Sequence, residues 1–489
     1  MTSLERRSLF ALLFLHLIGW VFIPLLTNTC LPLDSIEAIY WGHEWQWGYD
    51  KHPPLSAWAA EGFAVMFGDA GIYLVSQLCV ILGAYGMWLV GRFFGLSVKQ
   101  RVMGILLMET IVFYQYTTPE FNVNIMQLPF WSLGWYWGLL AAESGKYRHW
   151  IGLGVCVAAG ALGKYLAVLM LPPLFAAYWQ RGQLKSVLGH PGIYLAGIVS
   201  ILLFLPHLLW MRAHDWQTIT YGLERTADEE TVGFFKAHFI NPLIYLLSQL
   251  GILAPALLIA RWGGGPAVKG DDKGLTGLAW GSLGVVFLLS VVMGWKPVTM
   301  WSVPFCLGIG MWAAARFSSA INLRKIVTGS LGVGVLALMA QVVVYGFGPV
   351  TREKAHKANY DGPGIAKAVE AIWADEVGGE LDIVIGDRFP AGIVSWYGES
   401  RPSVMVMGDE NLSSPAASNE LVREKGALVI WRKSRDSESA AVKQVEEILP
   451  RAVTEFPEME LLDDLVVQYP RRSDGQAIRF GIGIVRPHE

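Results

Sequence analysis

Charged residues are scarce in this 489-residue chain: only 16% are Asp, Glu, Lys or Arg, whereas 53% are hydrophobic. Soluble domains carry about a quarter of charged residues, so the composition excludes a wholly soluble protein and indicates a membrane protein. The net charge is −3, and no basic cluster or nucleic-acid motif is present. We therefore expect the lipid bilayer as a partner of this chain, and no nucleic acid.

Cysteine is also scarce, and the four cysteines all lie in or beside apolar segments (Cys30, Cys79, Cys156 and Cys306). This placement excludes a disulfide framework and a paired-cysteine metal site. His43, Asp50 and His52 match no standard metal-ligand spacing, so no metal is expected. Gly362–Gly364 lacks the preceding strand of a dinucleotide fingerprint, and no repeat of fixed period is present. We therefore expect no cofactor.

Long apolar runs dominate the first 350 residues, and we take them as the candidate membrane spans. They fall at 9–28, 70–94, 102–118, 123–142, 149–163, 165–180, 191–211, 237–260, 276–294, 298–315 and 326–347. The first follows Glu5–Arg7 as in a signal sequence, but no small-residue cleavage site follows it, so we expect an uncleaved helix.

Positive residues collect in alternate loops, which the positive-inside rule assigns to the cytoplasm. These loops hold Arg6 and Arg7, Arg92 to Arg101, Lys146 and Arg148, Arg181 and Lys185, Arg261 to Lys273, and Arg316 to Lys325. Residues 149–180 read as one long span or as a hairpin that turns near Lys164. The positive flanks on both sides favour the hairpin. This choice gives about eleven crossings and a C-terminal part outside the cytoplasm.

Three outward segments follow from this topology. Leu31–Trp58 is rich in aromatic residues, which is typical of helices that lie in the membrane interface. Arg212–His238 forms a second outward segment. In 351–489, helix-like stretches alternate with short apolar runs, which indicates a small α/β domain. We therefore predict a polytopic α-helical domain at 1–350 and a periplasmic α/β domain at 351–489.

Asp34 opens the first outward segment, and Glu37 follows it by three residues. One interpretation is a capping box, in which two side chains satisfy the free N–H groups of a helix start. The functional interpretation is a carboxylate at the membrane surface that takes a proton from an acceptor hydroxyl. Both interpretations stay open, because a capped helix would also fix the carboxylate.

Lys51 and His52 follow Asp50 and precede Pro53 and Pro54, which hold the preceding residues extended. Cations at this place would stabilise a phosphate leaving group as it gains charge. The structural alternative is that Lys51 reaches to the membrane interface and that His52 is a buried hydrogen-bonded residue.

Glu120 follows Thr118 and Pro119 before the fourth span, and Lys164 lies at the tip of the proposed hairpin. Glu120 is either a charge that stabilises a helix N-terminus or a second acid that contacts the sugar or the acceptor. A lysine within the membrane is a candidate functional residue. Lys164 is either a phosphate contact or the partner of a nearby acid.

Further cations lie at the same predicted membrane level. His207 and Arg212 end the seventh span, and Lys296 follows the ninth. They would suit an anionic lipid headgroup, although each taken alone is also an ordinary interfacial anchor.

Taken together, these stretches resemble the GT-C glycosyltransferases, and in particular the protein O-mannosyltransferase and lipid A aminoarabinose transferase type of the bacterial envelope. The matching stretches are Leu33–Ala38, His52–Trp58, Thr118–Glu120, Gly160–Tyr165, Pro206–Trp210 with His214–Trp216, and Lys296–Pro297. They follow the family's order through nearly the whole membrane part. The C-terminal domain matches only loosely.

The resemblance implies an inverting glycosyltransferase with a polyprenyl-phosphate-linked sugar as donor and an active site on the periplasmic side of the inner membrane. It implies that Asp34 is the catalytic base and Glu120 the second acid, although related sequences usually carry Asp there. Donor contacts are then expected from Glu37, Lys51, His52, Lys164, His207, Arg212 and Lys296. Glu37 stands where the aminoarabinose enzymes tend to carry Arg, which argues against the same donor sugar. The acceptor would be lipid A, other lipopolysaccharide or another glycan.

A transporter or flippase for lipid-linked sugars is the rival from another class. Transporters usually show paired repeats and broken helices with polar residues at the middle of the membrane. Here the acids cluster at one surface and no repeat is visible, so the sequence favours the transferase.

Overall fold

The computed structural model describes residues 3–226, 233–268, 273–351, 356–433, 441–472 and 476–488. It divides the chain into two compact units. The first comprises Met1–Val21, Lys51–Leu55 and Leu74–Ala340. The second comprises Phe22–Asp50, Ser56–Tyr73 and Gln341–Glu489. Apart from Lys51–Leu55, the first outward segment therefore belongs to the same compact unit as the C-terminal domain. The predicted domain boundary at residue 350 stays a prediction.

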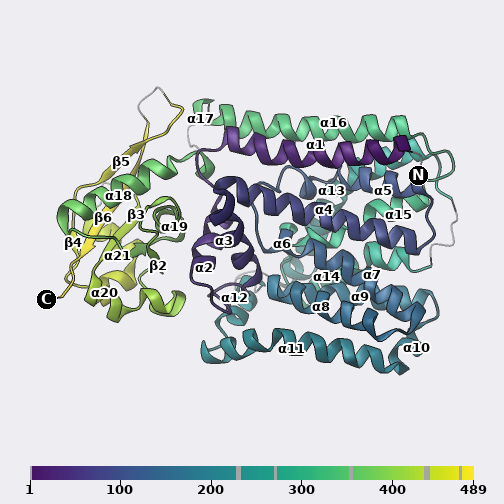
Figure 1. Ribbon diagram of the computed structural model, residues 1–489, viewed down its shortest axis with the longest axis horizontal. Coiled ribbons are helices and arrows are strands. Elements are labelled where there is room, and N and C mark those ends of the chain that lie inside the picture. The colour runs from purple at the N-terminus through teal and green to yellow at the C-terminus, as the bar shows by residue number, and fades with distance from the viewer. Residues whose placement is uncertain are drawn as a thin grey trace. The chain divides into compact units, whose positions relative to one another are not determined.

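The first unit is a bundle of helices, three of which continue into the second unit (Figure 1). They are α1 (Ser3–Thr27), α4 (Asp69–Phe93), α5 (Val98–Met108), α6 (Val123–Met126), α7 (Leu128–Ser144), α8 (Tyr147–Gly163), α9 (Leu171–Gln180), α10 (Leu184–Gly189), α11 (Pro191–Ala213), α12 (Gln217–Thr226), α13 (Asn241–Gly264), α14 (Leu275–Met293), α15 (Ile309–Arg316) and α16 (Leu323–Gln341). Among the described residues, six helices are long and apolar enough to cross a membrane. The polytopic helical fold is thus confirmed, and the count of about eleven crossings stays a prediction.

Two predicted spans are wrong as continuous helices. The predicted span 102–118 is helical only as far as Met108, because buried Glu109 and Thr110 follow and bond outside a regular helix. The predicted span 298–315 is broken into 3-10 helices at Thr299–Ser302 and Pro304–Cys306, followed by α15. Pro304 has no N–H to donate, which removes one of the backbone bonds that an α-helix would make there.

The segment 149–180 is not one continuous helix, in agreement with the predicted hairpin. Helix α8 ends at Gly163, and Lys164 has an extended backbone with φ −165° and ψ 138°. A 3-10 helix, Tyr165–Met170, then leads into α9. Both halves of the segment pack on α7 at Gly134. A Cβ at Gly134 would meet Cys156 of α8 and Met170 of the 3-10 helix.

Small residues allow the helices of this bundle to approach closely. Figure 1 shows α8 between α7 and α11, and its glycines face both neighbours. A Cβ at Gly152 would lie 2.8 Å from the ring of Trp137, and one at Gly154 would lie 2.6 Å from the carbonyl oxygen of Ala196. Close backbone packing through glycine is typical of helix pairs in membranes.

The second unit combines helices of the first outward segment with an α/β domain. Its helices are α2 (Leu33–His43), α3 (Leu55–Phe67), α17 (Gly348–Thr351), α18 (Gly362–Glu376), α19 (Arg388–Tyr397), α20 (Asn419–Lys425), α21 (Ala441–Ile448) and α22 (Pro450–Glu455). Its strands are β1 (Ile383–Gly386), β2 (Ser403–Val406), β3 (Ala427–Arg432), β4 (Glu460–Leu461), β5 (Leu465–Gln468) and β6 (Ala477–Val485).

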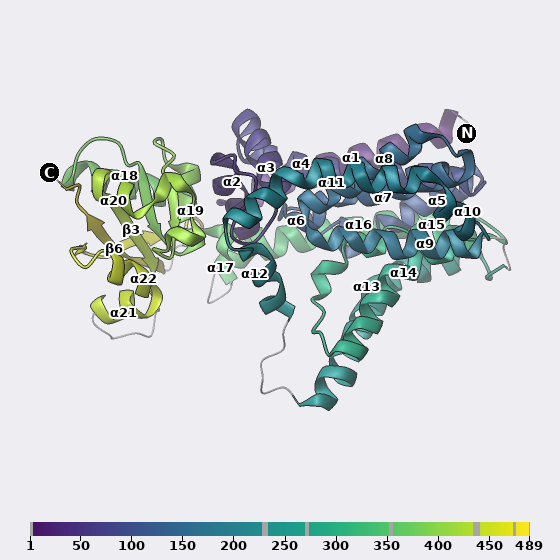
Figure 2. The ribbon, with the colours of Figure 1, turned by 90° about the horizontal axis from the view of Figure 1, so that it is seen from below.

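The six strands form one mixed sheet in the order β2-β1-β3-β6-β4, with β5 also paired to β6. Strands β1, β2 and β3 are parallel, and β6 runs antiparallel to β3. Helices α21 and α22 lie on the opposite side of the sheet from α18 (Figure 2). Because both faces are covered, the residues of β1 are all buried.

The predicted α/β domain is confirmed in its elements. The helix-like stretch 364–373 lies in α18, and 437–448 ends in α21, although 437–440 lie outside the described residues. The apolar runs at 381–385, 427–431, 465–469 and 480–485 contribute to β1, β3, β5 and β6. Strand β2 and helix α19 were not predicted.

Candidate active site

Lys164 lies at the break between α8 and the following 3-10 helix, and only 8% of its surface is exposed. Its Nζ donates a hydrogen bond of 2.8 Å to Oδ1 of Asn124. The same Nζ lies 4.7 Å from the ring centroid of Trp301. A cation over an indole face is stabilised by the negative face of the ring. Lys164 is thus a buried cation that bonds Asn124 and lies over the ring of Trp301.

The next residue, Tyr165, connects this cation to α11 and α12. The hydroxyl of Tyr165 lies 2.6 Å from Nε2 of His207 and donates a bond of 2.7 Å to Oγ1 of Thr218. His207 is fully buried, and Thr218 is 1% exposed. Buried polar groups of this kind are costly unless they are bonded, so these three side chains fix one another's positions.

An unusual turn places α12 at this site. Asp215 and Trp216 have positive φ angles of 49° and 57°, a conformation that side-chain-bearing residues rarely adopt. Such residues cost about 1–3 kcal/mol each and persist where surrounding contacts hold them. The turn reverses the chain so that Thr218 reaches Tyr165.

Lys51 and His52 contact the same short helix. The Nζ of Lys51 lies 5.9 Å from the ring centroid of Tyr221, and the ring of His52 lies 6.0 Å from it in an edge-on arrangement. Tyr221 follows Thr218 by three residues, which places the two side chains on one side of α12. The structure therefore joins four predicted donor contacts, Lys51, His52, Lys164 and His207, through Tyr165 and α12.

Glu120 is tied to the same cluster through its backbone. The side-chain amide of Asn122 donates to the carbonyl oxygen of Glu120 at 3.0 Å. Oδ1 of Asn122 accepts from the N–H of Asn124, whose own Oδ1 accepts from Lys164. Asn122 caps α6, so that Glu120 lies before the helix and not in its first turn. The alternative, a charge that stabilises the helix N-terminus, stays a prediction.

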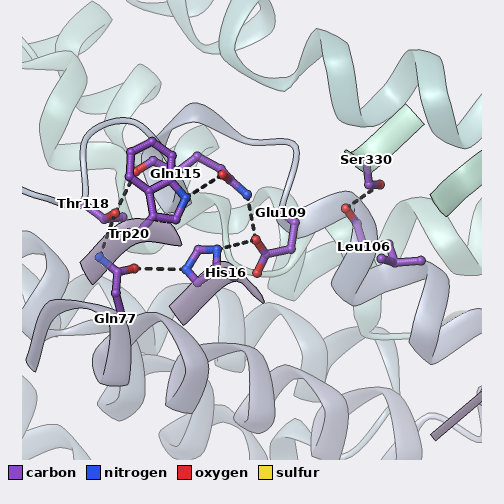
Figure 3. A network of polar contacts seen from close by, with 8 residues as sticks. All are labelled: His16, Trp20, Gln77, Leu106, Glu109, Gln115, Thr118 and Ser330. Atoms are coloured by element: carbon purple, nitrogen blue, oxygen red, sulfur yellow. Dashed lines mark hydrogen bonds and ion pairs between the residues drawn. The ribbon is translucent and has the colours of Figure 1, made fainter. Parts of the chain in front are cut away.

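A buried polar network holds the chain just before Glu120, as Figure 3 shows. Oγ1 of Thr118 accepts from Nε2 of Gln77 at 3.0 Å and donates to the carbonyl oxygen of Gln115 at 2.7 Å. The carbonyl oxygen of Thr118 accepts from Ser76 at 2.6 Å. These bonds fix the backbone two residues from the predicted second acid.

The same network contains a buried ion pair that the sequence analysis missed. Nδ1 of His16 lies 2.7 Å from Oε2 of Glu109, and Nε2 of His16 lies 3.0 Å from Oε1 of Gln77. The amide of Gln115 donates to Glu109 at 2.7 Å and accepts from the indole of Trp20 at 2.8 Å. The sequence did indicate this pair, because His16 and Glu109 are single ionisable residues inside apolar runs. Such residues are costly in a bilayer unless they have a partner.

Asp34 lies in the first turn of α2 and is exposed. Pro32 precedes this helix and makes no side-chain cap, so the capping-box interpretation of Asp34 is wrong. Asp34 belongs to the second unit and Glu120 to the first. A pocket shared by these two acids therefore stays a prediction, as do their catalytic roles.

Glu37 is buried one turn later in α2 and pairs with the α/β domain. Nε of Arg388 lies 3.7 Å from Oε1 of Glu37, and its Nη2 donates a bond of 2.6 Å to Oδ2 of Asp50. Burial alone would lower the pKa of Arg388, but the charges of Asp50, Tyr40 and Glu37 raise it above its usual value. Arg388 is thus a permanent cation. The donor-contact role of Glu37 stays a prediction.

Two other predicted donor contacts are exposed. Arg212 lies in the last turn of α11, and Lys296 follows α14. Their roles stay predictions. Within the described part of the chain, no three His, Cys, Asp or Glu side chains are arranged to hold a metal ion.

Comparison with known proteins gives a family match for part of the chain and a similar fold for nearly all of it. Residues 51–210 match the family of dolichyl-phosphate-mannose-protein mannosyltransferases. The fold is similar to that of ArnT from Cupriavidus metallidurans bound to undecaprenyl phosphate, with a TM-score of 0.67, 11% identity, and coverage of 99% of this chain and 98% of that chain. The apo state of the same ArnT gives a TM-score of 0.64 at 11% identity, with 98% of each chain covered. No curated protein matches the chain in a sequence search.

The fold of ArnT therefore extends over 99% of this chain and includes the small C-terminal domain. The segment from Lys51 to Trp210 matches the dolichyl-phosphate-mannose-protein mannosyltransferase family. The predicted resemblance is thus confirmed. The matched segment holds Lys51, His52, Glu120, Lys164 and His207, which are the site residues of the first unit that the contacts above link.

Proposed function

We propose that this protein is an inverting glycosyltransferase that takes its sugar from a polyprenyl-phosphate donor. The observation that carries the proposal is the linked set of basic residues in the membrane-spanning unit. Lys51 and His52 contact Tyr221 of α12, and α12 is bonded through Thr218 to Tyr165, next to buried Lys164. Such a set suits a phosphate group presented at the end of a lipid chain.

Lys164 is the strongest phosphate contact of the set. A lysine inside a bilayer is retained where it has a functional partner, and Nζ of Lys164 lies beside the side-chain oxygen of Asn124 and over the ring of Trp301. A phosphate oxygen would add a charge-assisted hydrogen bond to this cation. ArnT of the same fold binds undecaprenyl phosphate, which supports a donor of this chemistry here.

The reaction needs one base and one stabilised leaving group. Asp34 would take the proton of the acceptor hydroxyl while its oxygen attacks the anomeric carbon on the face opposite the phosphate. The bond between the anomeric carbon and the phosphate oxygen breaks, and the electron pair leaves with the phosphate, so the configuration inverts. Lys51, His52, Lys164 and His207 would stabilise the growing phosphate charge. Glu120 would hold the sugar or the acceptor.

The acceptor that we propose is a cell-envelope glycan or glycolipid, with lipid A and other lipopolysaccharide as the first to test. The place of reaction would be the periplasmic side of a bacterial inner membrane, with the C-terminal domain on that side. Glu37 and the identity of the sugar are separate from this proposal, since pairing with Arg388 already accounts for the burial of Glu37.

The decisive experiment uses the purified full chain in lipid nanodiscs with synthetic undecaprenyl-phosphate sugars and lipid A. We expect wild-type protein to release undecaprenyl phosphate and to form a new glycosidic bond. Asp34→Asn should abolish transfer without changing undecaprenyl phosphate binding. Asp463→Asn is the matched control, because Asp463 is equally exposed but lies in the C-terminal domain. Near-normal transfer by Asp34→Asn would refute the base assignment. Movement of the intact donor across the membrane without transfer would establish the flippase instead.

A further inference from the structure

Helix α19 of the α/β domain contacts the first outward segment with residues from both of the helix's ends and from its middle. A Cβ at Gly392 would lie 2.5 Å from Cγ2 of Ile36 and 2.9 Å from Cδ1 of Tyr40, both on α2. The hydroxyl of Tyr397 accepts a bond of 2.9 Å from the N–H of Leu31. All of these residues lie in the second compact unit. The only side chain small enough for this approach is that of glycine.

We infer that α19 is a docking surface that positions helix α2, and with it Asp34, and that Arg388 is the positioning residue of this surface. The inference rests on the proposed function for the role of Asp34. It assigns to the C-terminal domain a part in the reaction, through the position of α2.

Arg388 bridges two acids, one within α2 and one after it. Glu37 lies within α2, and Asp50 follows it and directly precedes Lys51. The side chains of Arg388, Glu37 and Asp50 are exposed by only 18%, 8% and 3%. Removal of one partner from a buried ion pair leaves an uncompensated charge, which costs about 3–5 kcal/mol. The guanidinium therefore sets the spacing between α2 and Asp50.

Two further contacts fix α3 and the start of α4 on the same part of the domain. Arg401 forms a two-bonded pair with Glu61 of α3, at 3.1 and 3.0 Å. The indole of Trp396 and the hydroxyl of Tyr397 donate to the two oxygens of Asp69, at 2.7 and 2.8 Å. Residues 31–69 are thus bonded to the α/β domain through Glu37, Asp50, Glu61 and Asp69.

A fixed position of α2 matters because of the chemistry that we propose for Asp34. A base acts only when its oxygen lies within hydrogen-bond reach of the hydroxyl proton. A misplacement of about 1 Å costs on the order of 100-fold in rate. Donor binding depends on Lys51, His52, Lys164 and His207 of the other unit, so loosening α2 should lower kcat and leave the affinity for undecaprenyl phosphate unchanged.

Three variants test the inference in the full-length protein. Arg388→Met removes the bridge, and Arg388→Lys keeps the charge but not the forked geometry. Gly392→Ala pushes on Ile36 without changing any charge. Arg486→Met is the matched control for the first two, because Arg486 pairs with Glu376 and Glu460 at the exposed far side of the domain. Gly62→Ala is the control for the third, since a Cβ at Gly62 has no atom within 4 Å.

Hydrogen exchange of residues 33–43 gives a readout that does not depend on activity. We expect Arg388→Met and Gly392→Ala to accelerate this exchange and to lower kcat by about 10- to 100-fold, with Arg388→Lys between them and wild type. The Kd of undecaprenyl phosphate should stay unchanged. The two controls should behave as wild type in all three measurements.

The outcomes separate the two proposals. Wild-type exchange in Arg388→Met and Gly392→Ala would overturn the docking role of α19. Faster exchange with a wild-type kcat would overturn the positioning role of Arg388. Failure of wild-type protein to transfer any sugar would refute the proposed function, whereas the exchange data would still decide whether α19 holds α2.

Discussion

Nδ1 of His16 lies 2.7 Å from Oε2 of Glu109, and the two side chains are only 3% and 5% exposed. His16 comes from α1, and Glu109 directly follows α5. The pair is continuous with Gln77 and Gln115, both of which bond Thr118 just before Glu120. An ion pair in the helix bundle thus supports the segment that carries the predicted second acid.

Breaking this pair should destabilise the protein. His16→Phe leaves the Glu109 carboxylate buried without its ionic partner, so we expect a loss of about 3–5 kcal/mol and a lower thermal midpoint in nanodiscs. The double variant His16→Phe with Glu109→Leu should regain much of this loss, because it removes both charges. Equal destabilisation by the single and double variants would contradict an ion-pair origin.

Lys164→Met should weaken binding of undecaprenyl phosphate. A hydrogen bond to a charged group contributes about 1.5–3 kcal/mol, so the Kd should rise by about tenfold or more. Lys325→Met is the control, since the Nζ of Lys325 also lies over an indole ring, 5.5 Å from the centroid of Trp262, but is exposed. Equal affinities in Lys164→Met and wild type would remove Lys164 from the donor site.

Tyr165→Phe should disturb the same site with little change in volume. It leaves His207 and Thr218 without the hydroxyl that joins them, and an unsatisfied buried group costs about 1–3 kcal/mol. We expect weaker undecaprenyl phosphate binding and a lower thermal midpoint. Tyr85→Phe is the control, because Tyr85 is 54% exposed. Identical behaviour of the two variants would show that the cluster has no such role.

Docking of α3 should depend on pH through Glu61. Burial alone would raise the pKa of Glu61, but bonds from His43 and Arg401 hold it below its ordinary value of 4.5. The ionised form is therefore the one that the folded state stabilises, so this contribution is present above pH 4.5 and is lost as the pH falls through the lowered pKa. The protection of residues 55–67 against hydrogen exchange, relative to the intrinsic rate at each pH, should fall in that window in wild type. Glu61→Gln should exchange fast already at neutral pH, and a wild-type profile in that variant would contradict the assignment.

The class of fold was predictable because hydrophobic runs report directly on burial in lipid. The 237–260 and 276–294 runs became α13 and α14 with shifts of a few residues. The prediction of one helix over 102–118 was wrong because mean hydropathy averages over Glu109. The charge of Glu109 is compensated by His16, which lies far away in the sequence. A window over one segment cannot detect a partner on another helix.

The cations of the candidate site could be predicted from the sequence, but the residues that contact them could not. Lys164 stands out as a charge in an apolar run, whereas Asn124 and Trp301 are ordinary residues of a span. Arg388 carried no signal, because one arginine in a soluble domain is unremarkable until its partners are known. Its pairing with Asp50 crosses 338 positions, which no local pattern can report.

That long separation also has a consequence for biosynthesis. Ribosomes deliver roughly 5–20 residues per second, so over the 338 positions that separate them Asp50 emerges roughly 20–70 s before Arg388. Throughout that time Glu37 and Asp50 lack the guanidinium beside which they are buried in the finished molecule. The helices can therefore insert one after another, but the first of the outward helices reaches its mature state only after translation of nearly the whole polypeptide. A nascent chain stalled before α19 should be inserted and inactive.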